Sequence, residues 1–240
     1  MFDYRRYGAE AGLTEDPQTE GSSSRGATET AAAKTTTTAL ADRRRSDPRR
    51  RLLGAMIEVV AERGYDRTTI SRLLSRAEVP EAVFSEHFRD KHDCFMQAID
   101  MVIGRVESSA IEMFAQTTPW PERVSRALEG LLAALARHQD AADVVFVEML
   151  GAGPAAGERH REAMNLFASL LEEGRGLCTE DAHLPKQTSE AIVGGIASIV
   201  HRRALQGKLA ELPSLHGDLT YFALLPYLDH ERAAAVAGLS

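Results

Sequence analysis

Residue types that could carry catalysis or bind a metal are scattered along this chain. Cys178, Asp181 and His183 fall in one short stretch, "CTEDAH" (178–183), which could bind a metal ion or simply form a surface loop. The glycines of "GAGPAAG" (151–157) lack the spacing of a dinucleotide-binding loop, and they follow an expected helix, so they are interpreted as a connector. No G-x-S-x-G, H-E-x-x-H or P-loop pattern occurs. The sequence therefore predicts neither an enzyme nor a cofactor or metal site.

Residues suited to binding phosphate groups are grouped more clearly than residues suited to catalysis. The segment "DRRRSDPRRR" (42–51) holds six arginines, which could contact a nucleic acid or form a solvated tail. Residues 42–91 hold 12 basic and 9 acidic side chains, a net charge of +3, whereas residues 92–240 hold 12 and 20, a net charge of −8. The acidic majority would be repelled by phosphates. Only the basic stretch is therefore expected to face a nucleic acid, although the whole chain carries −7.

Composition is that of a water-soluble protein of 240 residues, 44% of them hydrophobic. Its two cysteines cannot form a disulfide framework, which favours a reducing compartment. No apolar run approaches the roughly 18–20 residues that a membrane-spanning helix needs, and the first residues lack the apolar core of a signal peptide. A cytoplasmic protein without membrane contact is expected. Residues 1–41 are poor in large apolar side chains and include "TTTT", so a disordered arm is predicted there.

Apolar residues repeat with a helical period from residue 49 onward, without convincing strand alternation. Helices are expected over "RRRLLGAMIEVVAERG" (49–64), "TTISRLLSRA" (68–77) and "PEAVFSEHF" (80–88), and Asp90 is placed to cap a longer one from 91 to 114. Three short helices, the last two joined by a tight turn, have the spacing of a helix-turn-helix.

Beyond "TTPWP" the expected helices are longer. They span about 121–138, 140–150, 155–176, 188–207 and 214–228, with a small terminal helix in "HERAAAVAG". The predicted fold class is all-α, a three-helix head followed by a larger helical body. The expected division is a basic-ended arm (1–46), a helix-turn-helix domain (47–95, motif about 69–88) and a helical domain (96–240).

The stretch "GYDRTTISRLLSRAEVPEAVFSEHFRDKHDCF" (64–95) resembles the DNA-binding head of the tetracycline-repressor (TetR) family of transcriptional regulators. Matching features include Gly64-Tyr65, the Thr68-Thr69 pair, the Leu73-Leu74 pair and His87-Phe88, all in register. The rest of the chain resembles the family in layout only. The resemblance implies a homodimer that binds a palindromic operator in double-stranded DNA and responds to a small-molecule effector.

Three residues depart from the family pattern. Glu78 stands where the family usually has glycine in the turn, so either φ is positive there, at a cost of about 1–2 kcal/mol, or the turn is built differently. Ser85 replaces a tyrosine that commonly contacts phosphate, and Glu86 replaces a residue that is frequently basic. Each change weakens the expected attraction to phosphate, and the arginine run could offset this loss.

The resemblance also implies roles for individual residues. Thr68, Thr69 and Ser71 would donate hydrogen bonds to phosphate at the start of the second helix. Glu81, Ala82 and Ser85 would face base edges on the third helix, which Pro80 opens. A glutamate can read cytosine, since its carboxylate accepts from the N4 amino group. The remaining expected contacts to backbone or minor groove come from His87, Lys91, Arg49, Arg50 and Arg51, the last three at the end of a flexible arm.

The body is expected to hold a ligand pocket and a dimer face. Large apolar side chains that would line the pocket, or else form an ordinary core, are Trp120, Phe146, Met149, Met164, Phe167 and Leu171. The helices at about 188–207 and 214–228 are apolar on more than one face, and Gly194-Gly195 would allow a close helix approach. They could form a four-helix interface with a second copy, or pack only within the chain.

Two function classes remain open on the sequence. The first is a DNA-binding transcriptional regulator, a repressor that leaves its operator when a small, largely apolar ligand binds. The second is a helical small-molecule-binding protein or enzyme whose helix-turn-helix head is only structural. Salt-dependent binding to a palindromic duplex would separate the two.

Overall fold

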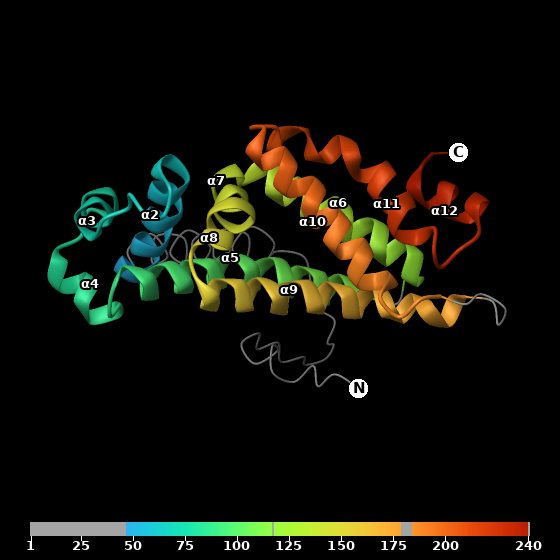
Figure 1. The fold of residues 1–240 in the computed structure, drawn as a ribbon, viewed down its shortest axis with the longest axis horizontal. Helices are drawn as coiled ribbons and strands as arrows, with labels where there is room; N and C mark the ends of the chain where they lie inside the picture. Colours follow the sequence, from blue (N-terminus) through green and yellow to red (C-terminus); the bar gives the residue numbers. More distant parts are fainter. Residues whose placement is uncertain (1–46, 117, 179–183, 240) are drawn as a thin grey trace, which may run out of the picture. The chain divides into compact units, whose positions relative to one another are not determined.

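The computed structural model describes residues 47–116, 118–178 and 184–239, and these residues form helices and turns without a strand. The all-α fold class expected from the sequence is therefore confirmed (Figure 1). The chain divides into residues 1–51 and residues 52–240. The first turn of α2 (Pro48–Arg63) belongs to the former, and the other described elements belong to the latter.

The three head helices form close to where apolar spacing and end signals place them. α2 ends at Gly64, whose φ of +83° is a conformation that glycine adopts without strain. α3 (Ile70–Ala77) and α4 (Glu81–His87) follow, the latter opened by Pro80 at a position that needs no N–H.

Glu78 ends α3 in the left-handed conformation, with φ 53° and ψ 49°. It is the one non-glycine residue with positive φ in the described part of the chain. Its backbone N–H and that of Val79 both donate to the carbonyl of Leu74, which closes the end of the helix. The turn therefore keeps the geometry that suits glycine and carries a glutamate there, at a cost of about 1–2 kcal/mol.

α5 (Lys91–Phe114) begins with the Asp90 cap that the sequence predicts, and Asp93 makes the cap reciprocal. The Asp90 carboxylate accepts from the Asp93 backbone N–H at 2.8 Å, and the Asp93 carboxylate accepts from the Arg89 backbone N–H at 3.0 Å. The second bond reaches Arg89, one residue earlier than a capping box usually does. This N–H holds the pKa of Asp93 below its usual value. The backbone N–H groups of Asp93 and Arg89 are thus satisfied at the start of α5.

The body continues with helices whose expected positions are largely correct. They are α6 (Trp120–Arg137), α7 (Gln139–Asp143), η2 (Val144–Glu148), α8 (Met149–Gly151), α9 (Pro154–Glu172), η3 (Glu173–Leu177), α10 (Thr188–Leu205), η4 (Leu209–Leu215), α11 (His216–Leu224) and α12 (His230–Ala237). The connector expected in "GAGPAAG" is limited to Ala152 and Gly153, because Gly151 ends α8 and residues 154–157 form the first turn of α9.

Three body helices differ from the prediction. The helix expected at 155–176 ends as the 3-10 helix η3 in place of regular α geometry. The helix expected at 140–150 contains a π-helical turn, η2, in place of regular α geometry. The helix expected at 214–228 covers only His216–Leu224, preceded by the 3-10 helix η4. Pro213 lies inside η4, and Pro226 disfavours α geometry at the residue before it, so the regular helix is confined between them.

Two apolar cores lie in this unit. One joins α2–α4 to the start of α5 and includes Val144, Met149 and Ala163 from the body. The other lies among α6, α9, α10 and α11. α5 and α9 run side by side (Figure 1), and the buried carboxylate of Glu107 pairs with both terminal nitrogens of Arg159 at 2.8 Å. This ion pair fixes α9 against α5, the helix that runs from the head into the body.

Candidate nucleic-acid interface and ligand cavity

α4 presents a polar face to solvent and an apolar face to the head core. Phe84 is buried and Val83 is partly buried, whereas Glu81, Ala82 and Ser85 are exposed. Positions 81 and 82 lie four and three residues before position 85, so both neighbour it on one side of the helix. The expected reading face is thus accessible, and so is Pro80 at its entry.

The three hydroxyl residues at the start of α3 have different environments. Thr69 occupies the N-cap position and is exposed, as is Ser71. Thr68 is 2% exposed, and its Oγ1 donates to the carbonyl of Gly64 at 2.9 Å. Thr68 therefore holds the α2–α3 turn together, and only Thr69 and Ser71 are accessible to a phosphate.

Lys91 is held within the head. Its Nζ donates to the carbonyl of Tyr65 at 2.9 Å and lies 4.1 Å from the centre of the Tyr65 ring. A cation over an aromatic face and against a carbonyl is stabilised where it lies. The Lys91 ammonium is thus engaged inside the protein, where the sequence comparison implies a DNA-backbone contact. The other flanking residue, His87, is partly buried beside Phe88.

Arg49, Arg50 and Arg51 lie in the first turn of α2. They are therefore helical rather than part of a flexible arm. The other three arginines of the basic run, at 43–45, and the predicted disordered arm lie outside the described residues.

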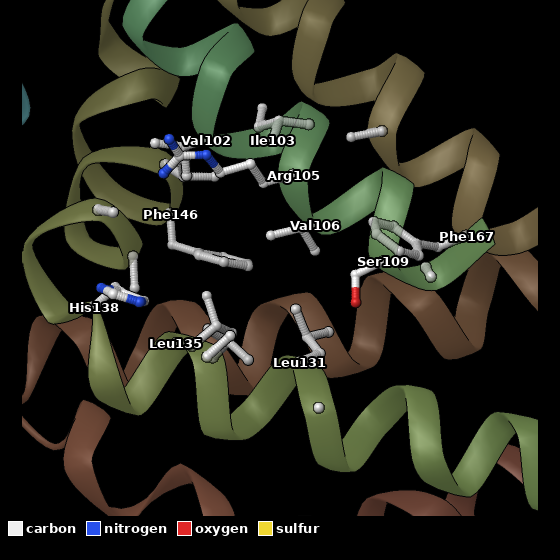
Figure 2. Close-up of a pocket in the computed structure, with 18 of the residues that line it drawn as sticks. Val102, Ile103, Arg105, Val106, Ser109, Leu131, Leu135, His138, Phe146 and Phe167 are labelled. Atoms are coloured by element: carbon white, nitrogen blue, oxygen red, sulfur yellow. The ribbon is translucent and has the colours of Figure 1, made fainter. Parts of the chain in front are cut away.

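A cavity of about 940 Å³ opens among α5, α6, η2, α9 and α10 (Figure 2). Four of the six expected pocket residues line it: Phe146, Met164, Phe167 and Leu171. The other two lie elsewhere. Met149 is fully buried in the head core, and Trp120 is buried in the body core, where its Nε1 donates to the carbonyl of Leu170 at 3.2 Å.

The cavity wall is mostly apolar, with basic side chains toward one end. Arg105 of α5 and His138, at the end of α6, lie toward the end where Phe146 is found, while Ser109 and Phe167 lie toward the other (Figure 2). Neither Arg105 nor His138 has a carboxylate partner among the described residues. His160 also lines the cavity, and burial lowers its pKa, which favours its neutral form. Sequence reasoning missed these polar groups because isolated basic residues on amphipathic helices carry no local signal.

The π-helix η2 touches both the cavity and the head. Phe146 lines the cavity, and its carbonyl lies 2.6 Å from Nδ1 of His201 on α10. Two residues later, the Glu148 carboxylate accepts from the backbone N–H of Tyr65 at 2.8 Å. Tyr65 is the residue whose carbonyl holds Lys91. One irregular segment thus connects the cavity wall to the α2–α3 turn, and π-helical turns occur frequently at functional sites.

The family model described as "Bacterial regulatory proteins, tetR family" matches residues 52–98. This stretch runs from α2 through α3 and α4 into α5, so it covers the helix-turn-helix and its expected reading face. The head of this chain therefore matches the TetR family.

Solved structures with the same fold include regulators and a receptor. The fatty acid degradation regulator FadR from Bacillus halodurans superposes with a TM-score of 0.67 at 19% identity, over 75% of this chain and 96% of FadR. FadR from Bacillus subtilis in complex with stearoyl-CoA gives 0.65 at 19% identity, over 73% and 97%. A gamma-butyrolactone receptor (ArpA-like protein) gives 0.59 at 16% identity, over 81% and 96%. No curated protein matches the sequence.

The body also exposes apolar side chains near the helices expected to pair with a second copy. Leu205 at the end of α10 is 63% exposed, Phe222 of α11 is 45% exposed, and Leu225 just beyond α11 is 42% exposed. A Cβ added to Gly195 would lie 3.4 Å from the Phe222 ring, an ordinary contact distance, so Phe222 packs over this glycine without requiring it. Within the described residues, no helix is long and apolar enough to cross a membrane.

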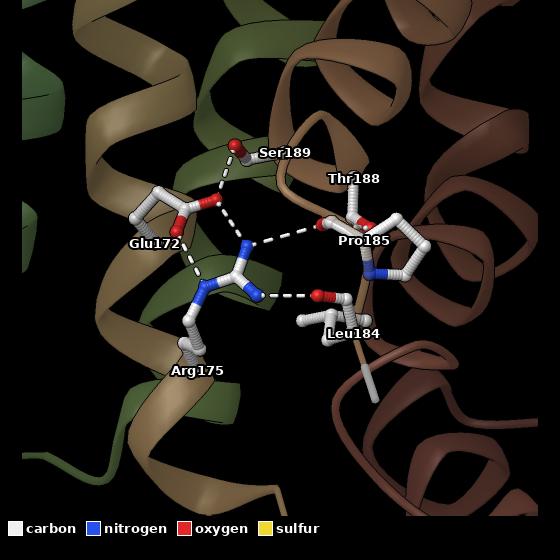
Figure 3. Close-up of polar contacts among 6 residues, drawn as sticks. All are labelled: Glu172, Arg175, Leu184, Pro185, Thr188 and Ser189. Carbon is white, nitrogen blue, oxygen red and sulfur yellow. Dashed lines mark hydrogen bonds and ion pairs between the residues drawn. The ribbon is translucent and has the colours of Figure 1, made fainter. Parts of the chain in front are cut away.

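A polar cluster in the body joins the end of α9 to the start of α10 (Figure 3). The Arg175 guanidinium donates to the Glu172 carboxylate and to the carbonyls of Leu184 and Pro185, while Ser189 donates to Glu172 at 2.5 Å. The Arg175 hydrogen bonds lower the pKa of Glu172. Asp181 and His183 of the suggested metal group lie outside the described residues, and the described residues contain no cluster that could hold a metal.

Proposed function

We propose that this TetR-family protein represses transcription by binding a palindromic operator as a homodimer, and that a small, largely apolar ligand in the cavity releases it. The observation that carries the proposal is the family match over α2–α4, together with the exposed face of Glu81, Ala82 and Ser85 on α4. A helix that presents a polar face beside a short turn can enter the major groove and read base edges.

A two-fold dimer is supported by the exposed apolar residues Leu205, Phe222 and Leu225. Large apolar side chains exposed near two neighbouring helices favour burial against an equivalent surface, and a two-fold axis makes that surface complementary to itself. Two-fold symmetry in the protein requires a (pseudo)palindromic site, with the two reading helices roughly 34–36 Å apart.

The ligand is proposed to have an apolar body and one acidic group. The cavity wall is largely apolar, while Arg105 and His138 offer positive charge or hydrogen-bond donors toward one end. The chemistry of the relatives is compatible with this, since one FadR structure holds stearoyl-CoA and another relative is a gamma-butyrolactone receptor. The ligand releases DNA only to the extent that it binds better to a conformation that does not fit the operator.

The test begins with selection of genomic DNA fragments by the purified protein. The expected result is enrichment of inverted repeats, bound by a species that light scattering identifies as a dimer. Addition of long-chain fatty acids or their thioesters should then lower the affinity for the selected duplex. Failure to enrich any fragment, together with a monomer at micromolar concentration, would contradict the proposal.

A further inference from the structure

A small cleft lies in the head where α2 ends and α3 begins. It is lined by Glu62 and Arg63 at the end of α2, by Arg67 in the connecting turn and by Arg72 in α3. Three arginines from three consecutive segments thus face one small space. Arginines repel one another, so their convergence is most stable when an anion lies between them.

The charge of this cleft is not neutralised by its own carboxylate. Arg76 NH2 donates to Glu62 at 2.6 Å, and Arg76 NH1 donates to Glu58 at 2.9 Å. The carboxylate of Glu62 is therefore already paired. Among the described residues no carboxylate pairs with the other three arginines, and Arg72 NH1 donates to the backbone carbonyl of Arg67 at 2.9 Å.

The place of the cleft in the fold indicates which anion it takes. It adjoins the start of α3, where Thr69 and Ser71 are exposed. In a helix-turn-helix protein the first helix of the motif crosses the DNA backbone while the second enters the major groove. A guanidinium fits a phosphate with two parallel hydrogen bonds, which the cleft can offer from more than one side.

Two other positions from which a phosphate contact is expected are engaged inside the protein. Thr68 is buried and donates to Gly64, and Lys91 is held by the carbonyl and ring of Tyr65. The reading helix itself carries Glu81 and Glu86. Attraction to the DNA backbone must therefore come largely from other cations.

We propose that Arg63, Arg67 and Arg72 form a phosphate-binding cleft that supplies sequence-independent affinity for the DNA backbone. This rests on the proposed function, because it assumes that the head binds duplex DNA. The cleft holds one or two backbone phosphates beside the groove that α4 enters, and it offsets the repulsion from Glu81 and Glu86.

The test measures how affinity for duplex DNA depends on salt. The full-length protein is titrated with a random-sequence duplex and with a selected operator at several salt concentrations. The variants are Arg63→Gln, Arg67→Gln, Arg72→Gln and the triple Gln variant, compared with a triple Lys variant that keeps the charge. A matched control removes the same charge from exposed positions of the body, Lys186→Gln, Lys208→Gln and Arg232→Gln together.

The slope of log K against log salt should fall by about 0.9 for each phosphate that a variant no longer neutralises, equally on both duplexes. The triple Lys variant and the body control should keep most of the wild-type slope. If the wild type and the triple Gln variant bind duplex DNA with the same salt slope, the proposed phosphate-binding cleft is wrong. The proposed function would still stand. Absence of duplex binding by the wild type would instead overturn the proposed function.

A further arm distinguishes backbone phosphate from a free phosphate ion. Pyrophosphate is added at constant ionic strength to the wild type and to the triple Gln variant. If pyrophosphate competes weakly with DNA for the wild type but not for the triple Gln variant, the result supports a cleft for backbone phosphate. Tight pyrophosphate binding that depends on the three arginines but leaves the DNA slope unchanged would overturn the proposal in favour of a small-anion site.

Discussion

Glu78 carries backbone strain at the turn between α3 and α4. Its φ of 53° places the Cβ of an L-residue close to the following carbonyl oxygen, a clash that glycine avoids. Its side chain also adds a negative charge just before the reading helix. The turn could be recognised in the sequence, but whether a glutamate would accept this geometry depended on the packing of α3 and α4.

Glu78→Gly should stabilise the protein. Relief of strain is worth about 1–2 kcal/mol, and the greater freedom of glycine in the unfolded chain offsets about 0.5–1 kcal/mol of it. The free energy of unfolding should therefore rise by up to about 1.5 kcal/mol, measured by urea denaturation. Glu86→Gly, which removes the same charge from within α4, should lower it by about 1 kcal/mol. Equal changes in the two variants would show that charge, not φ, matters.

Gly174 lies directly under the Trp120 indole. A Cβ added there would be 2.3 Å from Cη2 of Trp120, and the indole is held because its Nε1 donates to the carbonyl of Leu170. Gly174→Ala should thus lower the free energy of unfolding by about 1–3 kcal/mol, the usual range for overpacking. The matched control is Gly176→Ala, because no atom lies within 4 Å of its added carbon. Thermal unfolding of both variants measures the difference. A decrease no larger than that of the control would mean that the ring moves freely.

At the scale of elements, local signals placed the head well and the body less well. Gly64, Pro80 and Asp90 mark helix ends through their own backbone or side chains, so their effects were readable from neighbouring residues. The π-helix η2 could not be recognised in this way, because the apolar residues 144–147 fit an ordinary helix equally well. This segment also makes long-range contacts that a local pattern does not reveal. One joins the Phe146 carbonyl to His201, 55 residues away.

The same limit applies to the candidate site. Thr68 has a residue type suited to a phosphate contact, and only the fold shows that its hydroxyl donates to Gly64 instead. The contact of Lys91 likewise could not be predicted locally, because its partner Tyr65 lies 26 residues earlier. The cavity residues Phe146 and Phe167 could be predicted as large apolar groups, but Trp120 and Met149 have the same character and pack elsewhere.

The contact between η2 and the head makes a prediction about ligand response. Glu148→Ala removes the carboxylate that accepts from the Tyr65 N–H, so a change at Phe146 is transmitted less effectively to the α2–α3 turn. Coupling of two sites is typically worth about 1–3 kcal/mol, or 5–150-fold in affinity. The ratio of DNA affinities without and with ligand should therefore move toward one, measured by fluorescence anisotropy.

The control for this change is Glu158→Ala, which removes the same charge from an exposed ion pair with Arg161 on α9. It should leave the ligand response as it is in the wild type. If Glu148→Ala folds, binds ligand and still shows the full decrease in DNA affinity, then the signal passes by another route, such as the packing between α5 and α9.

At the scale of the whole molecule, charge and apolar surface are separated along the chain. The cations concentrate at residues 42–91, and in the proposed function the acidic excess of residues 92–240 would orient the protein with its head toward DNA. The exposed apolar residues Leu205, Phe222 and Leu225 lie on α10 and around α11, far along the sequence from the head. A dimer through these helices would leave both heads available for one duplex.

The last prediction tests this dimer face. Leu205→Glu places a charge where a 63% exposed leucine would be buried by a second copy, so it should convert the dimer to a monomer without unfolding it. Leu150→Glu, at a leucine 52% exposed on α8, is the control and should remain dimeric. Light scattering gives the mass, circular dichroism reports the fold, and operator binding should weaken strongly because a monomer contacts only one half-site. A Leu205→Glu protein that stays dimeric would place the interface elsewhere on the body.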